Sequence, residues 1–273
     1  MRNILDQIVA DKRKEVHLRK QVLLQEYLEK SPLFERTPIR MADTVRASTT
    51  GIIAEFKRRS PSKSVINQNA NVQDVAQGYE EAGFGGMSVL TDGKYFGGSL
   101  DDLILARASC SLPLLRKEFI IDEYQILTAK AYGADCILLI AAVLSAEEIK
   151  HYSAFAGSLG LSVLCEIHGE DELQKTLVET VDMIGVNNRN LKTFEVDIAT
   201  SKNLADQIPK EFLKVSESGI SDPRTIVELM PYGFEGFLIG ECFMKEHDPA
   251  LAAFKFAEEL KTLHTQKSIR LKE

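Results

Sequence analysis

The chain has 273 residues, of which 44% are hydrophobic and 27% are charged. These proportions are typical of a folded globular protein and exclude an intrinsically disordered one. With 33 Lys and Arg against 40 Asp and Glu, the formal net charge is −7, which argues against a protein that coats nucleic acid. No apolar run approaches the roughly 18 residues of a transmembrane helix, so we expect no membrane partner.

The cysteines and the amino terminus indicate where the protein works. Cys110, Cys136, Cys165 and Cys242 lie far apart, and three of them fall in apolar runs. We therefore expect buried thiols in a reducing cytoplasm rather than disulfides. The charged amino terminus does not look like a secretory signal. The five histidines lack the spacing of metal ligands, so we expect no metal site.

The first 48 residues are expected to form a helical extension (1–48). Apolar residues from Leu5 to Leu28 recur near helical spacing among abundant Lys, Glu and Gln. Ser31-Pro32 should interrupt this stretch, and a second short helix is expected near residues 33–46.

From Gly51 onward, short apolar runs alternate with longer amphipathic segments. Helices are expected in segments such as VQDVAQGYEEAG (72–83), several of which end in a Gly that stops the helix. The apolar runs are GIIAEFK, GMSVLT, PLLRK, CILLI, SVLCE, MIGVN, FLKVSE and GFLIG. Eight such runs predict an α/β protein with a single (β/α)8 TIM barrel over 49–262, followed by a polar tail over 263–273. An open doubly wound sheet is the alternative.

Charged and polar side chains stand where the apolar runs end, and in a barrel the carboxyl ends of the strands face the active site. Alternation along the first run puts Glu55 and Lys57 on one face, and we expect them to form an inward ion pair. A pair that only fixes the strand is the alternative. With Lys117 and Glu166 at later run ends, the mouth would hold several proton donors and acceptors.

The last two runs are followed by glycine-containing loops. Gly219 lies just before a helix start at Asp222, and Gly240 directly follows the last run. In many barrels the loops after strands seven and eight bind phosphate through backbone N–H groups, and glycine allows a close approach. We expect a phosphate site there, with plain turns as the alternative.

The segment 58–72, RRSPSKSVINQNANV, is too long and polar for a minimal connection. We expect a mobile loop that covers the substrate. Its Arg58, Arg59 and Lys63 could equally be solvated surface charges.

Several segments together closely resemble the indole-3-glycerol phosphate synthase family, in the family's order and over nearly the whole chain. The most specific are AEFKRRSPS and NNRNL, supported by PLLRKEFIIDEYQI, LCEIHGEDEL and VSESGI. The resemblance implies a carboxy-lyase of tryptophan biosynthesis that needs no cofactor. Its substrate would be 1-(2-carboxyphenylamino)-1-deoxyribulose 5-phosphate, which loses carbon dioxide and water as the indole ring closes.

The resemblance also implies residue roles. Lys117 matches the general acid that protonates the ketone oxygen, and Glu166 matches the carboxylate that stabilises the developing positive charge and assists dehydration. Lys57, paired with Glu55, matches the lysine that contacts the substrate carboxylate. The implied catalytic set is Lys117, Glu166, Lys57, Glu55, Asn187 and Ser218. The implied substrate-binding set is Arg189, Phe96, Phe119, Leu191 and Glu217. The implied phosphate-binding set is Ser60, Gly219, Gly240 and Glu241, the last through its backbone N–H.

Three other functions remain open from the residues. A sugar-phosphate isomerase would use a Cys and an Asp at strand ends, whereas the first run ends in Glu and Lys. A Schiff-base aldolase would use Lys117 or Lys57 as a nucleophile. A non-catalytic barrel would only bind a sugar phosphate. We favour the synthase, acting on a small phosphorylated molecule as a monomer or weak homo-oligomer.

Overall fold

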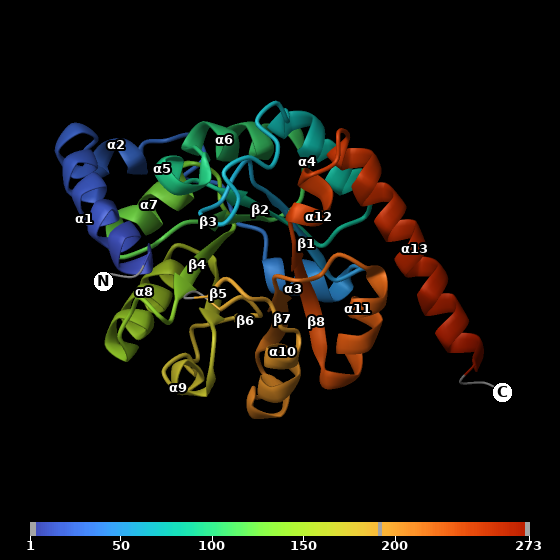
Figure 1. Cartoon of the computed structure of the whole chain (residues 1–273). Helices are drawn as coiled ribbons and strands as arrows, with labels where there is room; N and C mark the ends of the chain where they lie inside the picture. Colours follow the sequence, from blue (N-terminus) through green and yellow to red (C-terminus); the bar gives the residue numbers. More distant parts are fainter. Residues whose placement is uncertain (1–3, 191–192, 271–273) are drawn as a thin grey trace.

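The computed structural model describes residues 4–190 and 193–270, and its centre is a closed barrel of eight parallel strands in sequence order (Figure 1). The predicted (β/α)8 barrel is therefore confirmed, because β8 pairs with β1 and leaves no open edge. The strands are β1 Ile52–Phe56, β2 Gly86–Leu90, β3 Leu114–Lys117, β4 Cys136–Ile140, β5 Ser162–Ile167, β6 Met183–Asn187, β7 Leu213–Glu217 and β8 Phe234–Ile239.

Helices follow the strands around the outside of the barrel (Figure 1). They are α4 Val72–Glu81, α5 Gly93–Phe96, α6 Leu100–Ser109, α7 Glu123–Ala131, α8 Ala146–Ser158, α9 Glu170–Leu173, α10 Ala199–Leu204, η1 Ala205–Gln207, α11 Pro223–Leu229, η2 Met230–Tyr232 and α12 Glu241–Met244. Several begin at a capping side chain that accepts a backbone N–H of the first turn, as Asp122 and Ser145 do. These caps fix where each helix leaves its strand.

The interior and exterior of the barrel follow the predicted alternation. Ile53 of β1 packs inside the barrel, whereas Ile52, Ala54 and Phe56 pack outward against the helices. Glu55 therefore points into the barrel mouth, as expected from the sequence.

The extension before the barrel consists of α1 Ile4–Val22, α2 Gln25–Glu29 and α3 Met41–Ala47. The prediction here was partly wrong, because the first helix already ends before Leu24 and residues 33–40 are not helical. Pro38 explains part of the difference, since a residue that precedes proline avoids the helical conformation. The backbone N–H of Met41 donates to Ser162 Oγ at the start of β5, at 3.3 Å, so α3 closes the amino-terminal end of the barrel.

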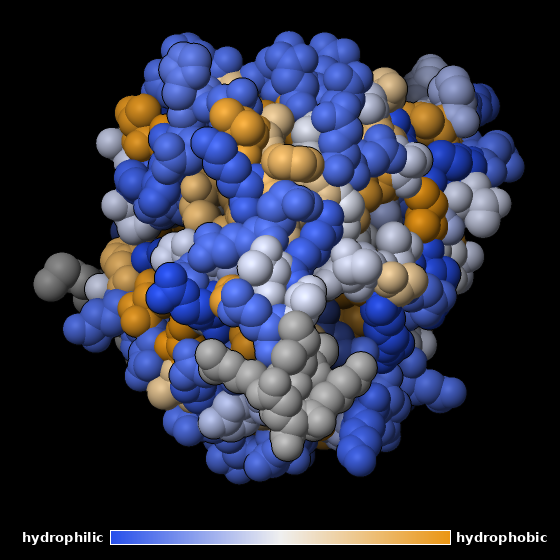
Figure 2. Space-filling view, turned by 90° about the vertical axis from the view of Figure 1, so that its right-hand side faces the viewer, coloured by the Kyte–Doolittle hydropathy of each residue, from blue (hydrophilic) through white to orange (hydrophobic). Residues whose placement is uncertain are grey.

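The last helix, α13 Pro249–Arg270, packs against α4 and α11 on the side opposite α1 (Figure 1). It runs across residue 262, and the domain boundaries at 48 and 262 stay predictions. The face of the molecule over α13 is mostly hydrophilic, with separate hydrophobic residues (Figure 2). Leu251 and Phe254 are exposed apolar side chains of this helix. No helix in the described ranges is long and apolar enough to cross a membrane.

Candidate active site

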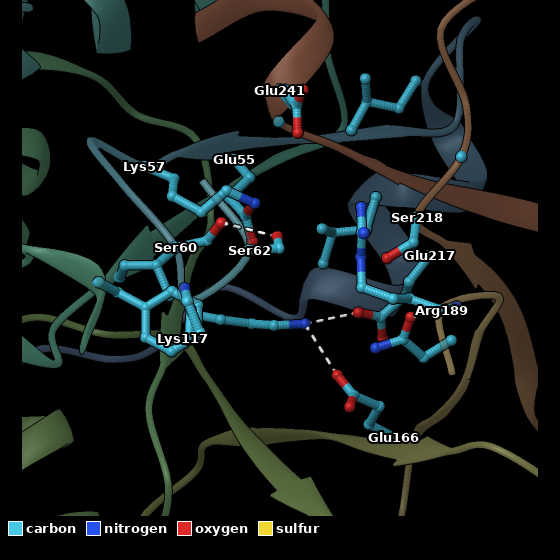
Figure 3. Close-up of a pocket in the computed structure, with 18 of the residues that line it drawn as sticks. Glu55, Lys57, Ser60, Ser62, Lys117, Glu166, Arg189, Glu217, Ser218 and Glu241 are labelled. Carbon is cyan, nitrogen blue, oxygen red and sulfur yellow. Dashed lines mark hydrogen bonds and ion pairs between the residues drawn. The ribbon is translucent and has the colours of Figure 1, made fainter. Parts of the chain in front are cut away.

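A cavity of about 360 Å³ opens at the carboxyl ends of the strands (Figure 3). Residues from all eight strands, the loop after β1 and the helix α1 line it together. Leu191 lies outside the described residues. The other candidates all line the cavity: Glu55, Lys57, Ser60, Phe96, Lys117, Phe119, Glu166, Asn187, Arg189, Glu217, Ser218, Gly219, Gly240 and Glu241.

Lys117 stands between two buried glutamates at the base of the cavity (Figure 3). Its Nζ donates to Glu217 Oε2 at 2.5 Å and to Glu166 Oε2 at 3.2 Å. The three side chains come from β3, β5 and β7, so only closure of the barrel brings them together. One ammonium therefore faces two carboxylates in a place that bulk water reaches poorly.

Burial and mutual charge move the pKa values of this group in different directions. Burial alone would lower the pKa of Lys117, but the charges of Glu217 and Glu166 outweigh it and hold the pKa above its ordinary value. Burial would raise the pKa of Glu166, yet Lys117 and His168 keep it lowered. Burial dominates at Glu217, where the repulsion from Glu166 adds to it and the pKa rises to about 7. The site thus combines an ammonium that stays protonated, a carboxylate that stays ionised and a carboxyl group that titrates near neutrality.

Glu55 and Lys57 form the expected inward pair, with Lys57 Nζ donating to Glu55 Oε1. Glu55 is 4% exposed, so its charge is balanced at the cavity wall rather than by solvent. A side chain at Gly240 would meet Glu55, because an added Cβ would lie 2.6 Å from Glu55 Oε1. Glycine at position 240 therefore leaves space for the Glu55–Lys57 pair, in addition to its expected role in the loop after β8.

Asn187 and Arg189 extend the polar wall from the end of β6. The Asn187 side chain hydrogen-bonds Glu166, and its Oδ1 accepts the backbone N–H of Arg189 at 3.0 Å. Arg189 donates from Nη1 to the carbonyl of Phe194 at 3.2 Å, which holds the guanidinium beside the cavity. The adjacent Asn188 is buried and hydrogen-bonds the side chain of Ser216 and others, so its role is structural.

An apolar wall closes another side of the cavity. The rings of Phe96 and Phe119 lie 5.9 Å apart at an interplanar angle of 40°. Ile4, Leu5 and Ile8 of α1 also line the cavity, a contribution that the sequence analysis missed. Their helical spacing was the signal, but spacing alone does not say which surface an amphipathic helix covers.

The loops after β7 and β8 form the opposite, polar end. Ser218 and Gly219 both have positive φ, 69° and 81°, which turns the chain sharply after β7. Ser60 Oγ and Ser62 Oγ lie 3.1 Å apart beside these loops. The side chain of Glu241 is paired, because its Oε1 accepts from Lys63 Nζ at 2.9 Å. This end offers hydroxyls and backbone N–H groups, as a phosphate requires.

The loop over 58–72 is attached to its neighbours at several points. Arg58 forms two hydrogen bonds to Asp102 of α6, at 2.6 and 2.8 Å. Arg59 donates to the carbonyl of Gly93 at 2.7 Å. The basic residues of this loop are therefore paired rather than freely solvated, and they position Ser60 over the cavity.

Across the described residues, no group of three or more His, Cys, Asp or Glu side chains is arranged to hold a metal ion. The cavity presents the ammonium and carboxyl groups named above. Such groups can protonate an oxygen that gains negative charge and stabilise a nearby cation.

The fold and the cavity define a TIM barrel that gathers ammonium and carboxyl groups at the carboxyl ends of its strands, where enzymes of this fold have their active sites. Comparison with known proteins identifies the family within this class of barrels. The family model described as indole-3-glycerol phosphate synthase matches residues 5–256. The chain belongs to the indole-3-glycerol phosphate synthase family, the carboxy-lyases that close the indole ring in tryptophan biosynthesis.

Individual relatives are similar to this chain in sequence over nearly their full lengths. The chain is 48% identical over 249 residues to the indole-3-glycerol phosphate synthase of Bacteroides thetaiotaomicron, covering 91% of this chain and 95% of that one. It is 41% identical over 268 residues to the synthase of Salinibacter ruber, covering 97% and 99%. Among solved structures, the tryptophan synthase complex from Pyrococcus furiosus matches with a TM-score of 0.58 at 16% identity, over 79% of this chain and 98% of that one. That likeness concerns the fold alone.

Proposed function

We propose that the protein converts 1-(2-carboxyphenylamino)-1-deoxyribulose 5-phosphate to indole-3-glycerol phosphate by lysine and glutamate acid–base catalysis. The observation that supports this most strongly is the Lys117 ammonium, which is held between Glu166 and Glu217 inside a cavity with one apolar and one polar end. A carboxyphenyl ring and a phosphate at opposite ends of one molecule match those two ends.

We place the aromatic ring against Phe96 and Phe119, under the apolar residues of α1. The phosphate then lies at Ser60 and the loops containing Gly219 and Gly240. This orientation brings the substrate carboxylate toward Lys57, whose ammonium balances its charge, and brings the ketone toward Lys117. Both contacts are charge-assisted and form where water is scarce.

In the first step, the ring carbon bearing the carboxylate attacks the ketone carbon. A carbon–carbon bond forms, the carbonyl π electrons move to oxygen, and Lys117 donates a proton to that oxygen. The ring nitrogen and ring carry the compensating positive charge, which Glu166 stabilises as a nearby anion.

Carbon dioxide then leaves, and the electrons of the broken carbon–carbon bond return to the cationic ring system. In the last step the new hydroxyl accepts a proton and leaves as water, while a base removes a proton from the ring system and the indole double bond forms. We assign Glu166 to this dehydration. Glu217, whose pKa lies near 7, can store a proton next to Lys117 between the steps.

We further propose that the protein works in the cytoplasm as a monomer or weak homo-oligomer. Its four cysteines are free, which suits a reducing compartment. The separate, rather than continuous, hydrophobic residues over α13 favour a face that stays in water (Figure 2).

Incubation with the carboxyphenylamino deoxyribulose phosphate tests the activity directly, because the indole product is followed by its fluorescence. Turnover with stoichiometric release of carbon dioxide is the expected result. Borohydride added during turnover should leave the protein unmodified, since Lys117 acts as an acid and forms no imine. A covalently trapped adduct on a lysine, or binding without any product, would contradict the proposal.

A further inference from the structure

A partly buried histidine outside the predicted site lies directly behind the Glu166 carboxylate. His168 follows β5, and its side chain is only 14% exposed. Its Nε2 lies 3.4 Å from Glu166 Oε1, on the oxygen that Lys117 does not contact. The two oxygens of Glu166 therefore face two different nitrogen groups.

The other side of the imidazole ring is fixed by Glu172 of α9. Glu172 Oε2 lies 3.2 Å from His168 Nδ1 and also accepts the backbone N–H of His168 at 2.8 Å. One carboxylate oxygen thus holds both the ring and its backbone. Because of this double attachment, the ring has a fixed orientation toward Glu166.

Charged groups reach His168 from three elements: Glu166 from β5, Glu172 from α9 and Glu217 from β7. Burial alone would lower the pKa of His168, but the hydrogen bond with Glu172 and the charge of Glu166 outweigh burial and raise it. A protonated imidazole carries a positive charge, which suits a ring placed between two carboxylates.

The contact between His168 Nε2 and Glu166 is close, but it is not a hydrogen bond. Within the described part of the chain, His168 Nε2 has no hydrogen-bond partner. The nitrogen therefore acts on Glu166 mainly through its positive charge, which helps to lower the pKa of Glu166. Asn187 supplies the direct hydrogen bond to the same carboxylate.

We propose that His168, held by Glu172, is a positioning residue that keeps the Glu166 carboxylate ionised and directed into the cavity. The inference rests on the proposed function, since it assigns the support of a group that function uses. His168 touches no cavity space itself, and its effect passes through Glu166.

The variant His168→Gln removes the charge and keeps a side chain that can donate a hydrogen bond. We expect kcat to fall about 10-fold near neutral pH while KM stays within about 3-fold, because the change acts on the acid–base step. The acidic limb of the kcat–pH profile should move up by about one pH unit, since Glu166 loses one of its cationic neighbours. A purely structural histidine would lower the thermal midpoint without moving that limb.

His151→Gln is the matched control, because His151 Nε2 also pairs with a glutamate, Glu123, at 2.8 Å, but on the exposed surface of α8. Its kcat and pH profile should equal those of the wild type. Glu172→Gln is the second variant and should shift the acidic limb in the same direction as His168→Gln, by less. If His168→Gln does not fold, the acidic limb of Glu172→Gln alone tests the role of His168.

An unshifted acidic limb in the folded variants would overturn the inference. Wild-type turnover in the same assay tests the proposed function separately. A wild-type protein without activity would refute that function, whereas an active wild type with unshifted variants would refute only the role of His168.

Discussion

Two lysines of this protein, Lys117 and Lys12, are each paired with more than one carboxylate, but they differ in where they lie. Lys117 lines the cavity, and Glu217 beside it keeps one buried oxygen, Oε1, that no described residue satisfies. One ammonium must serve Glu166 and Glu217 together. The charges of this cavity cluster (Lys117, Glu166 and Glu217) are close, buried and incompletely paired.

Lys12 is also buried, at 2% exposure, but it joins α1 to the barrel. Its Nζ lies 2.7 Å from Glu15 and 3.0 Å from both Asp92 and Glu118. Glu118 additionally accepts from Thr91 and from a backbone N–H, so its oxygens are satisfied. The comparison teaches that a saturated buried charge cluster holds structure together, whereas an unsaturated one that faces a cavity is available for chemistry.

Lys117→Met tests the role of the cavity cluster most directly, because it removes the cation of this cluster and nearly keeps the side-chain volume. We expect kcat to fall about 10³-fold or more, because we assign the protonation of the ketone oxygen to this ammonium. The circular dichroism spectrum should match that of the wild type. Wild-type turnover in a folded Lys117→Met variant would show that the acid is another residue.

Glu166→Gln tests the carboxylate of the same cluster. Glutamine keeps the shape but can neither ionise nor accept a proton, so kcat should fall about 10²-fold with a small change in KM. Comparison with Glu241→Gln controls for loss of a negative charge at the cavity mouth. Equal losses in the two variants would mean that overall charge, rather than position, is what matters.

Lys12→Met is the structural counterpart of Lys117→Met. Removing the cation leaves the carboxylates of Asp92 and Glu118 buried and unpaired, which should lower the free energy of unfolding by about 3–5 kcal/mol. Because α1 carries part of the apolar wall, KM should rise, but kcat should fall far less than in Lys117→Met. Urea unfolding and steady-state kinetics on both variants measure this, and a stable but inactive Lys12→Met would reverse the two roles.

Much of the barrel and its mouth could be predicted because both depend on local patterns. Each apolar run became a strand, and alternation correctly placed Glu55 inward from its own strand alone. Closure of the barrel then necessarily brought Lys117 and Glu166 to the same end. None of this requires knowledge of contacts between distant segments.

The contribution of α1 could not be predicted in this way. Nothing in the spacing of Ile4 and Ile8 says that they cover the cavity rather than a neighbouring helix. The pairing of Lys12 with Asp92 joins segments eighty residues apart and depends on the docking angle of α1. His168 was considered only as a metal ligand, and its closeness to Glu166 depends on how the chain turns after β5.

The pH dependence of stability tests the cavity cluster through Glu217, whose pKa rises to about 7 in the folded protein. A carboxyl with a raised folded pKa binds its proton more tightly when folded, so its stabilising contribution is present at low pH. That contribution is lost as the pH rises from about 4.5 through about 7. Between about pH 5 and about pH 8, the wild type should therefore lose about 2 kcal/mol more than Glu217→Gln. If the free energies of unfolding of the two proteins changed equally with pH across this range, the prediction would be wrong.

The smallest effect is expected at the ion pair between Lys63 and Glu241, which joins the loop after β1 to α12 at 2.9 Å. Both side chains are more than two-fifths exposed, so solvent screens the pair, and its loss should change the free energy of unfolding by less than about 1 kcal/mol. The hydrogen bond to Lys63 is the main cause that lowers the pKa of Glu241. Lys63→Met should therefore raise KM only about 2- to 5-fold, by loosening the loop that carries Ser60, and leave kcat unchanged. Added salt should reduce the difference between Lys63→Met and the wild type, because an exposed pair is screened whereas the buried clusters are not. A variant that loses kcat instead would place Lys63 with the cavity cluster rather than with the surface.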